Sequence, residues 1–193
     1  MQGIHSVAVF CGSNSGVDPA FAAGARALGH GLAACGMRLV YGGGRVGLMG
    51  AVADAALEAG GAVLGVIPEF LARREVAHSG VVDLVTTDSM HDRKQLMFAE
   101  SDAFVSMPGG LGTLDETIEI ITWRQLKLHD KPILLCDIAG SARPLLAAID
   151  AAISLGFAAA GARRLFEVAD GVDALLRRLQ SLPRADAVAA ERL

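Results

Sequence analysis

The chain has 193 residues, which favours one domain with a large buried core. Hydrophobic residues make up 52% of the sequence and aromatic residues only 5%, which suits alanine-rich helices packed on a sheet and argues against an aromatic-rich β-sandwich. The net charge is −4, and the arginine pairs are scattered along the chain, so no basic stripe predicts nucleic-acid binding.

The three cysteines, Cys11, Cys35 and Cys136, lie far apart and show neither a CxxC motif nor the Cys/His spacing of a metal site. We expect them to be buried thiols in a reducing compartment. The N-terminus has no basic segment followed by a long apolar run, and no run of 18 apolar residues predicts a membrane span. These features lead us to expect a cytoplasmic protein with no membrane partner.

Short apolar runs alternate with helix-forming segments along the whole chain. The predicted strands are residues 6–11, 37–41, 62–67, 81–86, 103–107, 131–136 and, weakly, 165–168. The predicted helices are residues 19–35, 48–59, 89–100, 117–128, 142–155 and 172–182. This alternation predicts an α/β, Rossmann-like fold, with a doubly wound parallel sheet of six to seven strands and helices on both faces. We expect a single domain over residues 1–182 and a flexible tail over residues 183–193.

Three glycine-rich turns each follow a predicted strand, at residues 12–16, 42–47 and 109–112. The carboxyl ends of parallel strands meet at one edge of the sheet, where α/β proteins bind their ligands. Glycine lets the backbone approach a ligand closely, and a helix start offers unpaired N–H groups to an anion. The turns therefore predict a phosphate or nucleotide site. The candidate contacts from the first two turns are Gly12, Ser13, Gly43 and Gly44.

The second turn matches the dinucleotide pattern G-x-G-x-x-G at Gly42, Gly44 and Gly47, and Glu69 lies about 20 residues further on. That pattern normally follows the first strand of the fold, whereas this turn follows the second predicted strand. A dinucleotide-dependent oxidoreductase is therefore the weaker interpretation. No lysine follows any of the three turns, which argues against an ATPase of the Walker A type.

Two adjacent cations, Arg93 and Lys94, stand near the start of a predicted helix. Cations at that position oppose the helix dipole, which a sequence tolerates more readily when an anion binds there. The alternative is a solvated helix face on which Asp92 and Glu100 are their partners.

Glu116 also has two interpretations. The spacing Thr113-x-x-Glu116 matches a capping box, in which Thr113 would cap the following helix and Glu116 would fold back onto the cap N–H. The same carboxylate, directly after a glycine turn, could act on a bound ligand. Asp115 and Glu119 are expected to be ordinary solvent-facing acids.

Residues 108–116 (PGGLGTLDE), together with residues 90–94 (MHDRK), resemble the paired signature of the Lonely Guy (LOG) family of cytokinin riboside 5′-monophosphate phosphoribohydrolases. Older similarity labelled this family lysine decarboxylase-like. Residues 9–13, 41–50, 67–69 and 121–126 also fit the family's order and spacing, so the resemblance covers about residues 4–180. The chain departs from the family at Asp115, where the pattern usually has Glu, and at Leu111, where an aromatic residue is common.

The resemblance implies hydrolysis of the N-glycosidic bond of nucleoside 5′-monophosphates, namely AMP and N6-modified AMP such as isopentenyl-AMP, to free base and ribose 5-phosphate. Arg93 and Glu116 would be catalytic, because positive charge develops on the ribose as the base departs and needs a nearby carboxylate. The resemblance implies no metal or organic cofactor. It also implies a homodimer in which residues 123–126 face the partner subunit. The implied substrate contacts are Glu75, Lys94, Gly109, Gly110, Leu111, Gly112, Thr113 and Thr122.

Two rival functions remain. A non-catalytic nucleotide carrier or sensor would keep the glycine turns but would not need Arg93 and Glu116 together. A pyridoxal phosphate-dependent decarboxylase would need a Schiff-base lysine, and Lys94 is the only lysine near the predicted site.

Overall fold

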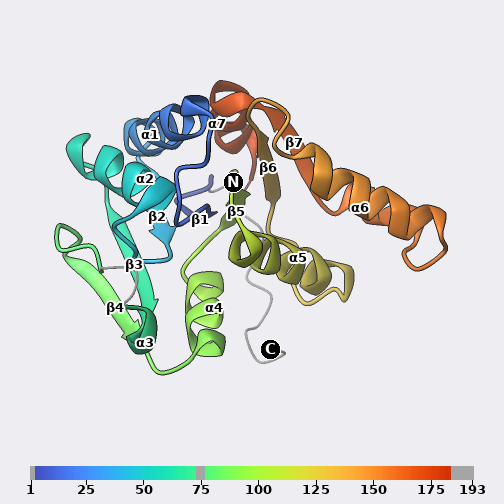
Figure 1. Ribbon diagram of the computed structural model, residues 1–193, viewed down its shortest axis with the longest axis horizontal. Coiled ribbons are helices and arrows are strands. Elements are labelled where there is room, and N and C mark those ends of the chain that lie inside the picture. The colour runs from blue at the N-terminus through green and yellow to red at the C-terminus, as the bar shows by residue number, and fades with distance from the viewer. Residues whose placement is uncertain (1–2, 73–76, 184–193) are drawn as a thin grey trace.

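The computed structural model describes residues 3–72 and 77–183, and its centre is one parallel sheet (Figure 1). The sheet has seven strands in the order β4-β3-β2-β1-β5-β6-β7, and every neighbouring pair is parallel. The strands are β1 (Ser6–Phe10), β2 (Arg38–Tyr41), β3 (Val63–Pro68), β4 (Asp83–Thr87), β5 (Ala103–Ser106), β6 (Ile133–Asp137) and β7 (Glu167–Asp170). The predicted doubly wound α/β fold is therefore confirmed, and the order of the strands reverses between β1 and β5.

Helices cover both faces of the sheet. They are α1 (Pro19–Ala34), α2 (Gly47–Glu58), α3 (Glu69–Ala72), α4 (Met90–Ala99), α5 (Leu111–Gln125), α6 (Arg143–Ser154), α7 (Gly171–Ser181) and the 3₁₀ helix η1 (Ala160–Arg164). One core cluster joins the sheet to α1, α2 and α7 through residues such as Leu28, Val52 and Leu175. A second cluster joins the opposite face to α4, α5 and α6, with Phe98 and Ile120 buried in it. The chain thus buries apolar side chains on both faces, as a parallel sheet requires.

The start of α1 follows from local chemistry. The Asp18 side chain accepts a hydrogen bond of 2.8 Å from the Ala20 amide, and Pro19 occupies the first helical position, where its missing N–H costs nothing. This helix is confirmed as predicted.

Most boundaries differ from the prediction by a few residues, and the start of α5 differs most. Helix α5 begins at Leu111, six residues before the predicted start at residue 117, because its cap is Gly110 within the glycine turn. The last strand is shifted to Glu167–Asp170, since residues up to Arg164 form η1. Pro183, the first residue of the predicted tail, forms an isolated antiparallel bridge with Gly3, and residues 184–193 lie outside the described part of the chain.

Among the described residues, no helix combines the length and apolar character that crossing a membrane requires.

Candidate active site

The three glycine turns meet at the carboxyl edge of the sheet. The Gly12 amide donates to the Pro108 carbonyl at 3.1 Å, and the Gly12 carbonyl accepts from the Leu48 amide at 2.9 Å. Gly47 has a φ of +62°, and a Cβ there would overlap the Ser13 backbone, so only glycine fits this approach. The first turn is thus hydrogen-bonded to residues that directly flank the other two turns, as the positions of the strands predict.

A hollow of about 360 Å³ lies beside these turns, at the point where the strand order reverses. Its lining includes four residues that the sequence indicated, Gly12, Ser13, Gly109 and Gly110. It also includes Asn14, Ser15 and Gly16 of the first turn, and Leu48 and Pro108 beside the other two. Sequence reasoning missed two further lining residues, Phe21 and Ser141. Phe21 and Ser141 come from α1 and the β6–α6 connection, and no motif connects them to the site.

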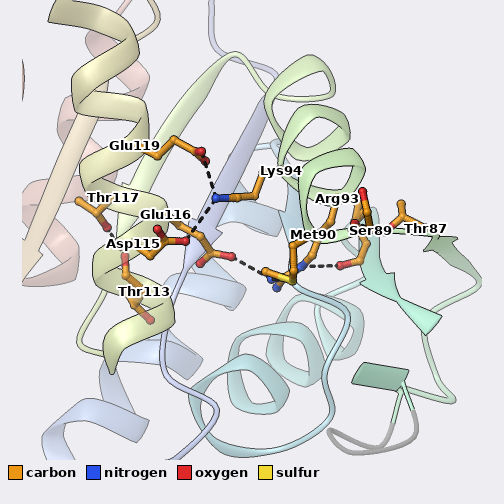
Figure 2. A network of polar contacts seen from close by, with 11 residues as sticks. Thr87, Ser89, Met90, Arg93, Lys94, Thr113, Asp115, Glu116, Thr117 and Glu119 are labelled. Atoms are coloured by element: carbon orange, nitrogen blue, oxygen red, sulfur yellow. Dashed lines mark hydrogen bonds and ion pairs between the residues drawn. The ribbon is translucent and has the colours of Figure 1, made fainter. Parts of the chain in front are cut away.

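The centre of the candidate site is an ion pair between α4 and α5. A guanidinium nitrogen of Arg93 lies 3.1 Å from a carboxylate oxygen of Glu116, and only 8% and 9% of the two side chains are exposed (Figure 2). Arg93 Nε also donates to the Val66 carbonyl at 3.1 Å. A Cβ at Gly42 would overlap the guanidinium, so the second glycine turn closes over this side chain. The structure therefore joins the two halves of the sequence signature in one buried contact.

The capping-box interpretation of Glu116 is wrong. Helix α5 has Gly110 as its N-cap, with no side-chain hydrogen bond at the cap, so Thr113 already lies inside the first turn. Glu116 stands in the second turn, where its carboxylate faces Arg93. The first N–H groups of α5 have no side-chain cap, which leaves them able to bind an anion.

Lys94 extends from α4 to two acids of α5. Its ammonium lies 3.3 Å from Asp115 and 3.0 Å from Glu119 (Figure 2). Burial opposes the charged form of Lys94, but its hydrogen bonds and charge interactions with Glu119 and Asp115 outweigh this effect and raise its pKa. Asp115 faces solvent as expected, with 62% of its side chain exposed, whereas Glu119 is only 26% exposed, and both acids also hold Lys94.

The alternative partners of the two cations are also wrong. The Ser89 hydroxyl accepts from the Asp92 amide at 3.1 Å and donates to the Asp92 carboxylate at 2.6 Å, so this acid belongs to the cap of α4. Glu100 pairs instead with Arg38, at 2.6 Å.

The remaining predicted contacts are dispersed. Gly43 accepts a hydrogen bond of 3.1 Å from the His78 amide, and Gly44 bridges to Ala77. Thr122 is exposed and donates to the Ile118 carbonyl at 2.8 Å, about three helical turns from the glycine turn. Thr113 is buried, Leu111 and Gly112 are exposed at the start of α5, and Glu75 lies outside the described residues. The structure thus brings Thr113 but not Thr122 to the edge of the sheet.

Two buried polar groups lie near the site, and one of them, Cys11, is a buried thiol as expected. Cys11 directly follows β1, and burial and the nearby Glu116 raise the pKa of its thiol far above the usual range, which favours its protonated form. The Tyr41 hydroxyl is buried and, within the described part of the chain, has no hydrogen-bond partner. Burial likewise raises the pKa of Tyr41. Burial thus favours the protonated form of both groups.

The described residues contain no group of three or more His, Cys, Asp or Glu side chains arranged to hold a metal ion.

The chain matches the family model described as "Possible lysine decarboxylase" over residues 49–179. It is 41% identical over 181 residues to the cytokinin riboside 5′-monophosphate phosphoribohydrolase LOG2 of Arabidopsis thaliana, with 93% of this chain and 85% of that protein covered. It is 43% identical over 177 residues to a cytokinin riboside 5′-monophosphate phosphoribohydrolase of Rhodococcoides fascians, with 91% and 89% covered.

Two solved structures share the fold at low identity. The molybdenum cofactor binding protein of Rippkaea orientalis superposes with a TM-score of 0.69 at 21% identity, covering 94% of this chain and 98% of that one. The molybdenum cofactor carrier protein of Chlamydomonas reinhardtii superposes with a TM-score of 0.67 at 22% identity, covering 92% and 97%. These two likenesses show the fold alone. The family match and the identities of 41% and 43% show more: the chain belongs to the LOG family of cytokinin riboside 5′-monophosphate phosphoribohydrolases.

Proposed function

We propose that this chain hydrolyses the N-glycosidic bond of nucleoside 5′-monophosphates, AMP and N6-modified AMP among them, and so releases cytokinin bases. The observation that carries the proposal is the buried Arg93–Glu116 pair, 3.1 Å apart, beside the start of α5. The names of the relatives in Arabidopsis thaliana and Rhodococcoides fascians support the same reaction.

The residues of the site suit each part of the substrate. The 5′-phosphate would bind the uncapped N–H groups at the start of α5, next to Gly109 and Gly110. The ribose would then lie near Glu116, which stands one turn further along the helix. Arg93 holds the Glu116 carboxylate in place and is itself held by the Val66 carbonyl. A carboxylate in this position can stabilise positive charge on the ribose and orient the attacking water.

The reaction balances without a cofactor. The C1′–N bond breaks and its electron pair leaves with the base, while the oxygen of water forms the new bond to C1′. The proton that this water loses passes to the Glu116 carboxylate and then to the departing base. Because the pair is buried, its electrostatic effect on the ribose is stronger than in water.

We also propose that the protein is a homodimer that packs through α5. Four apolar residues of α5 and its C-terminal end are exposed at helical spacing: Leu111 at 86%, Leu114 at 39%, Ile118 at 41% and Leu126 at 62%. Such a stripe is typical of a surface that a partner covers. Light scattering of the wild type and of Ile118→Glu tests this proposal. We expect the wild type to be a dimer and Ile118→Glu to be a monomer, and a monomeric wild type would contradict the proposal.

The reaction is tested by incubating the purified protein with AMP, GMP, CMP, UMP and N6-isopentenyl-AMP and measuring the free base. We expect base release from AMP or its N6-modified form, and loss of at least about 100-fold in rate for Glu116→Gln, which keeps the size of the side chain but removes its charge. Exposed Glu58, on α2, provides the control Glu58→Gln, which should keep full activity. Tight nucleotide binding by the wild type without base release would instead indicate a carrier or sensor.

A further inference from the structure

Two adjacent sets of ionic contacts join the helices that carry the site (Figure 2). Arg93 of α4 contacts Glu116 of α5, and the next residue, Lys94, contacts Asp115 and Glu119. Consecutive residues of one helix therefore hold three acids of the other.

The charge of Lys94 is already balanced by protein groups. Its ammonium has three N–H donors, and carboxylates 3.3 Å and 3.0 Å away accept from it. Together Lys94, Asp115 and Glu119 carry a net charge of −1 by formal charges, one cation against two anions. A phosphate dianion that approached Lys94 would therefore also meet Asp115 and Glu119, which repel it.

The Lys94 contacts lie between the inner ion pair and the solvent. The exposed fraction of the side chain is 19% for Lys94 and 26% for Glu119, against 8% and 9% for Arg93 and Glu116. Further along the two helices the contact is apolar, because the rings of Phe98 and Trp123 meet edge to face at 5.3 Å between centroids. At the end nearest the site, polar side chains thus hold α5 against α4.

We propose that Lys94 is a positioning residue that clamps α4 to α5 through Asp115 and Glu119, and so fixes the Glu116 carboxylate relative to the ribose. This inference rests on the proposed function, and it replaces the expected contact between Lys94 and the nucleotide. Reaction rates are sensitive to such placement, since an error of about 1 Å in a reacting group can cost about 100-fold in rate.

The two roles of Lys94 predict different kinetics. In the clamp, Lys94→Met removes both contacts, whereas Glu119→Gln removes only the charge of one partner. Lys94→Met should therefore lower kcat at least about tenfold and Glu119→Gln by a smaller factor, and both should leave KM for AMP within about threefold. The kcat of the double variant should lie within about threefold of the kcat of the slower single variant, because the two changes act on one interaction. Lys127→Met, at the exposed C-terminal end of α5, is the matched lysine control and should keep the kcat and KM of the wild type.

The opposite pattern would overturn the clamp. If Lys94 binds the phosphate, Lys94→Met raises KM at least about tenfold with kcat little changed, and Glu119→Gln lowers KM because it frees the lysine. Additive losses in the double variant would also overturn it. Thermal unfolding of each variant is measured alongside, and if Lys94→Met does not fold, Glu119→Gln and Asp115→Asn apply the same criteria.

Direct binding separates a failure of the clamp from a failure of the proposed reaction. Titration calorimetry of AMP is carried out in Glu116→Gln, which does not consume the ligand. Adding Lys94→Met to that variant should change its Kd by no more than about threefold, whereas a Kd more than tenfold weaker would assign Lys94 to the phosphate. A wild type that releases no base from any nucleotide would overturn the proposed function, and the calorimetric comparison would still decide the role of Lys94.

Discussion

The guanidinium of Arg93 and the carboxylate of Glu116 lie 3.1 Å apart, and each side chain is more than nine-tenths buried. Residues 23 positions apart in the chain, counted from 93 to 116, meet in this contact because α4 and α5 pack on the same face of the sheet. Burying two charges costs free energy, which their mutual attraction and the hydrogen bond to Val66 offset only while both partners are present.

Removal of Arg93 should therefore unfold the protein more easily as well as stop turnover. We expect Arg93→Met to lower the free energy of unfolding by about 3–5 kcal/mol, since Glu116 is left with a buried charge. Arg38→Met is the control, because Arg38 forms an equally direct but half-exposed pair with Glu100. That change should cost about 1 kcal/mol or less. Urea denaturation measures the free energy of unfolding of both variants. Equal losses would contradict the prediction that the burial of the Arg93–Glu116 pair makes the loss of Arg93 more costly.

A second prediction concerns two buried hydroxyl groups. The Tyr41 hydroxyl has no partner among the described residues, so Tyr41→Phe should leave the stability unchanged or increase it. Thr117 instead donates to the Thr113 carbonyl at 2.6 Å and lies 2.8 Å from the Ser106 hydroxyl. Thr117→Val should cost about 1–3 kcal/mol, because it leaves Ser106 unpaired. Denaturation midpoints compare the two, and a destabilised Tyr41→Phe would reveal a partner for this hydroxyl.

Adjacent glycines of the third turn should respond differently to alanine. A Cβ on Gly109 would overlap the Thr113 side chain, whereas a Cβ on Gly110 would meet no atom within 4 Å. We expect Gly109→Ala to cost about 1–3 kcal/mol in stability and Gly110→Ala about 1 kcal/mol or less. If Gly110→Ala folds normally but its KM for AMP rises, the substrate approaches this Cα closely. Equal stability of the two variants would show that Thr113 moves aside.

The stability should fall below neutral pH because of His129. Burial lowers the pKa of this histidine from 6.5, and the nearby Arg124 and Lys131 add to the effect, although the hydrogen bond to Ile120 opposes it. In the unfolded chain His129 takes up a proton at a higher pH than it does in the folded protein. Its contribution to the free energy of unfolding is therefore fully present above about pH 6.5 and is lost as the pH falls toward the pKa of His129 in the folded protein.

Unfolding free energies at pH 7.5 and 5.5 measure this loss. The wild type should lose more stability between the two values than His129→Gln does, while His5→Gln, at an exposed position, should keep the loss of the wild type. The same loss in His129→Gln would assign the pH dependence to other groups.

The fold could be predicted from the alternation of apolar strands and helices, because each buried parallel strand reads as a short apolar run. The position of Glu116 near a glycine turn was equally visible. The start of α5 could not be predicted in this way, because Thr113 and Glu116 match a capping box whether or not the helix has begun earlier, at Leu111. Local spacing cannot distinguish these cases, as only the backbone of Gly110 decides where the helix begins.

Contacts across the fold were the other gap. The spacing of Asp92 and Glu100 on the helix of Lys94 suggested local partners, but Asp115 and Glu119 come from another helix, brought near by the packing of α4 and α5. Phe21 and Ser141 reach the hollow in the same way. Such positions depend on the three-dimensional arrangement of whole elements, and no local pattern carries them.

The uncapped start of α5 and the Glu116 carboxylate belong to one rigid helix, which rises about 1.5 Å per residue. If the phosphate binds at Gly110 and Leu111, the distance from phosphate to carboxylate is set by the backbone and not by a flexible loop. The helix would then select substrates by length, because only a substrate whose glycosidic bond lies at the matching distance from its phosphate reaches the Glu116 carboxylate. Nucleosides without phosphate, and nucleotides phosphorylated at the 3′ position, would fail this measure even when their base is correct.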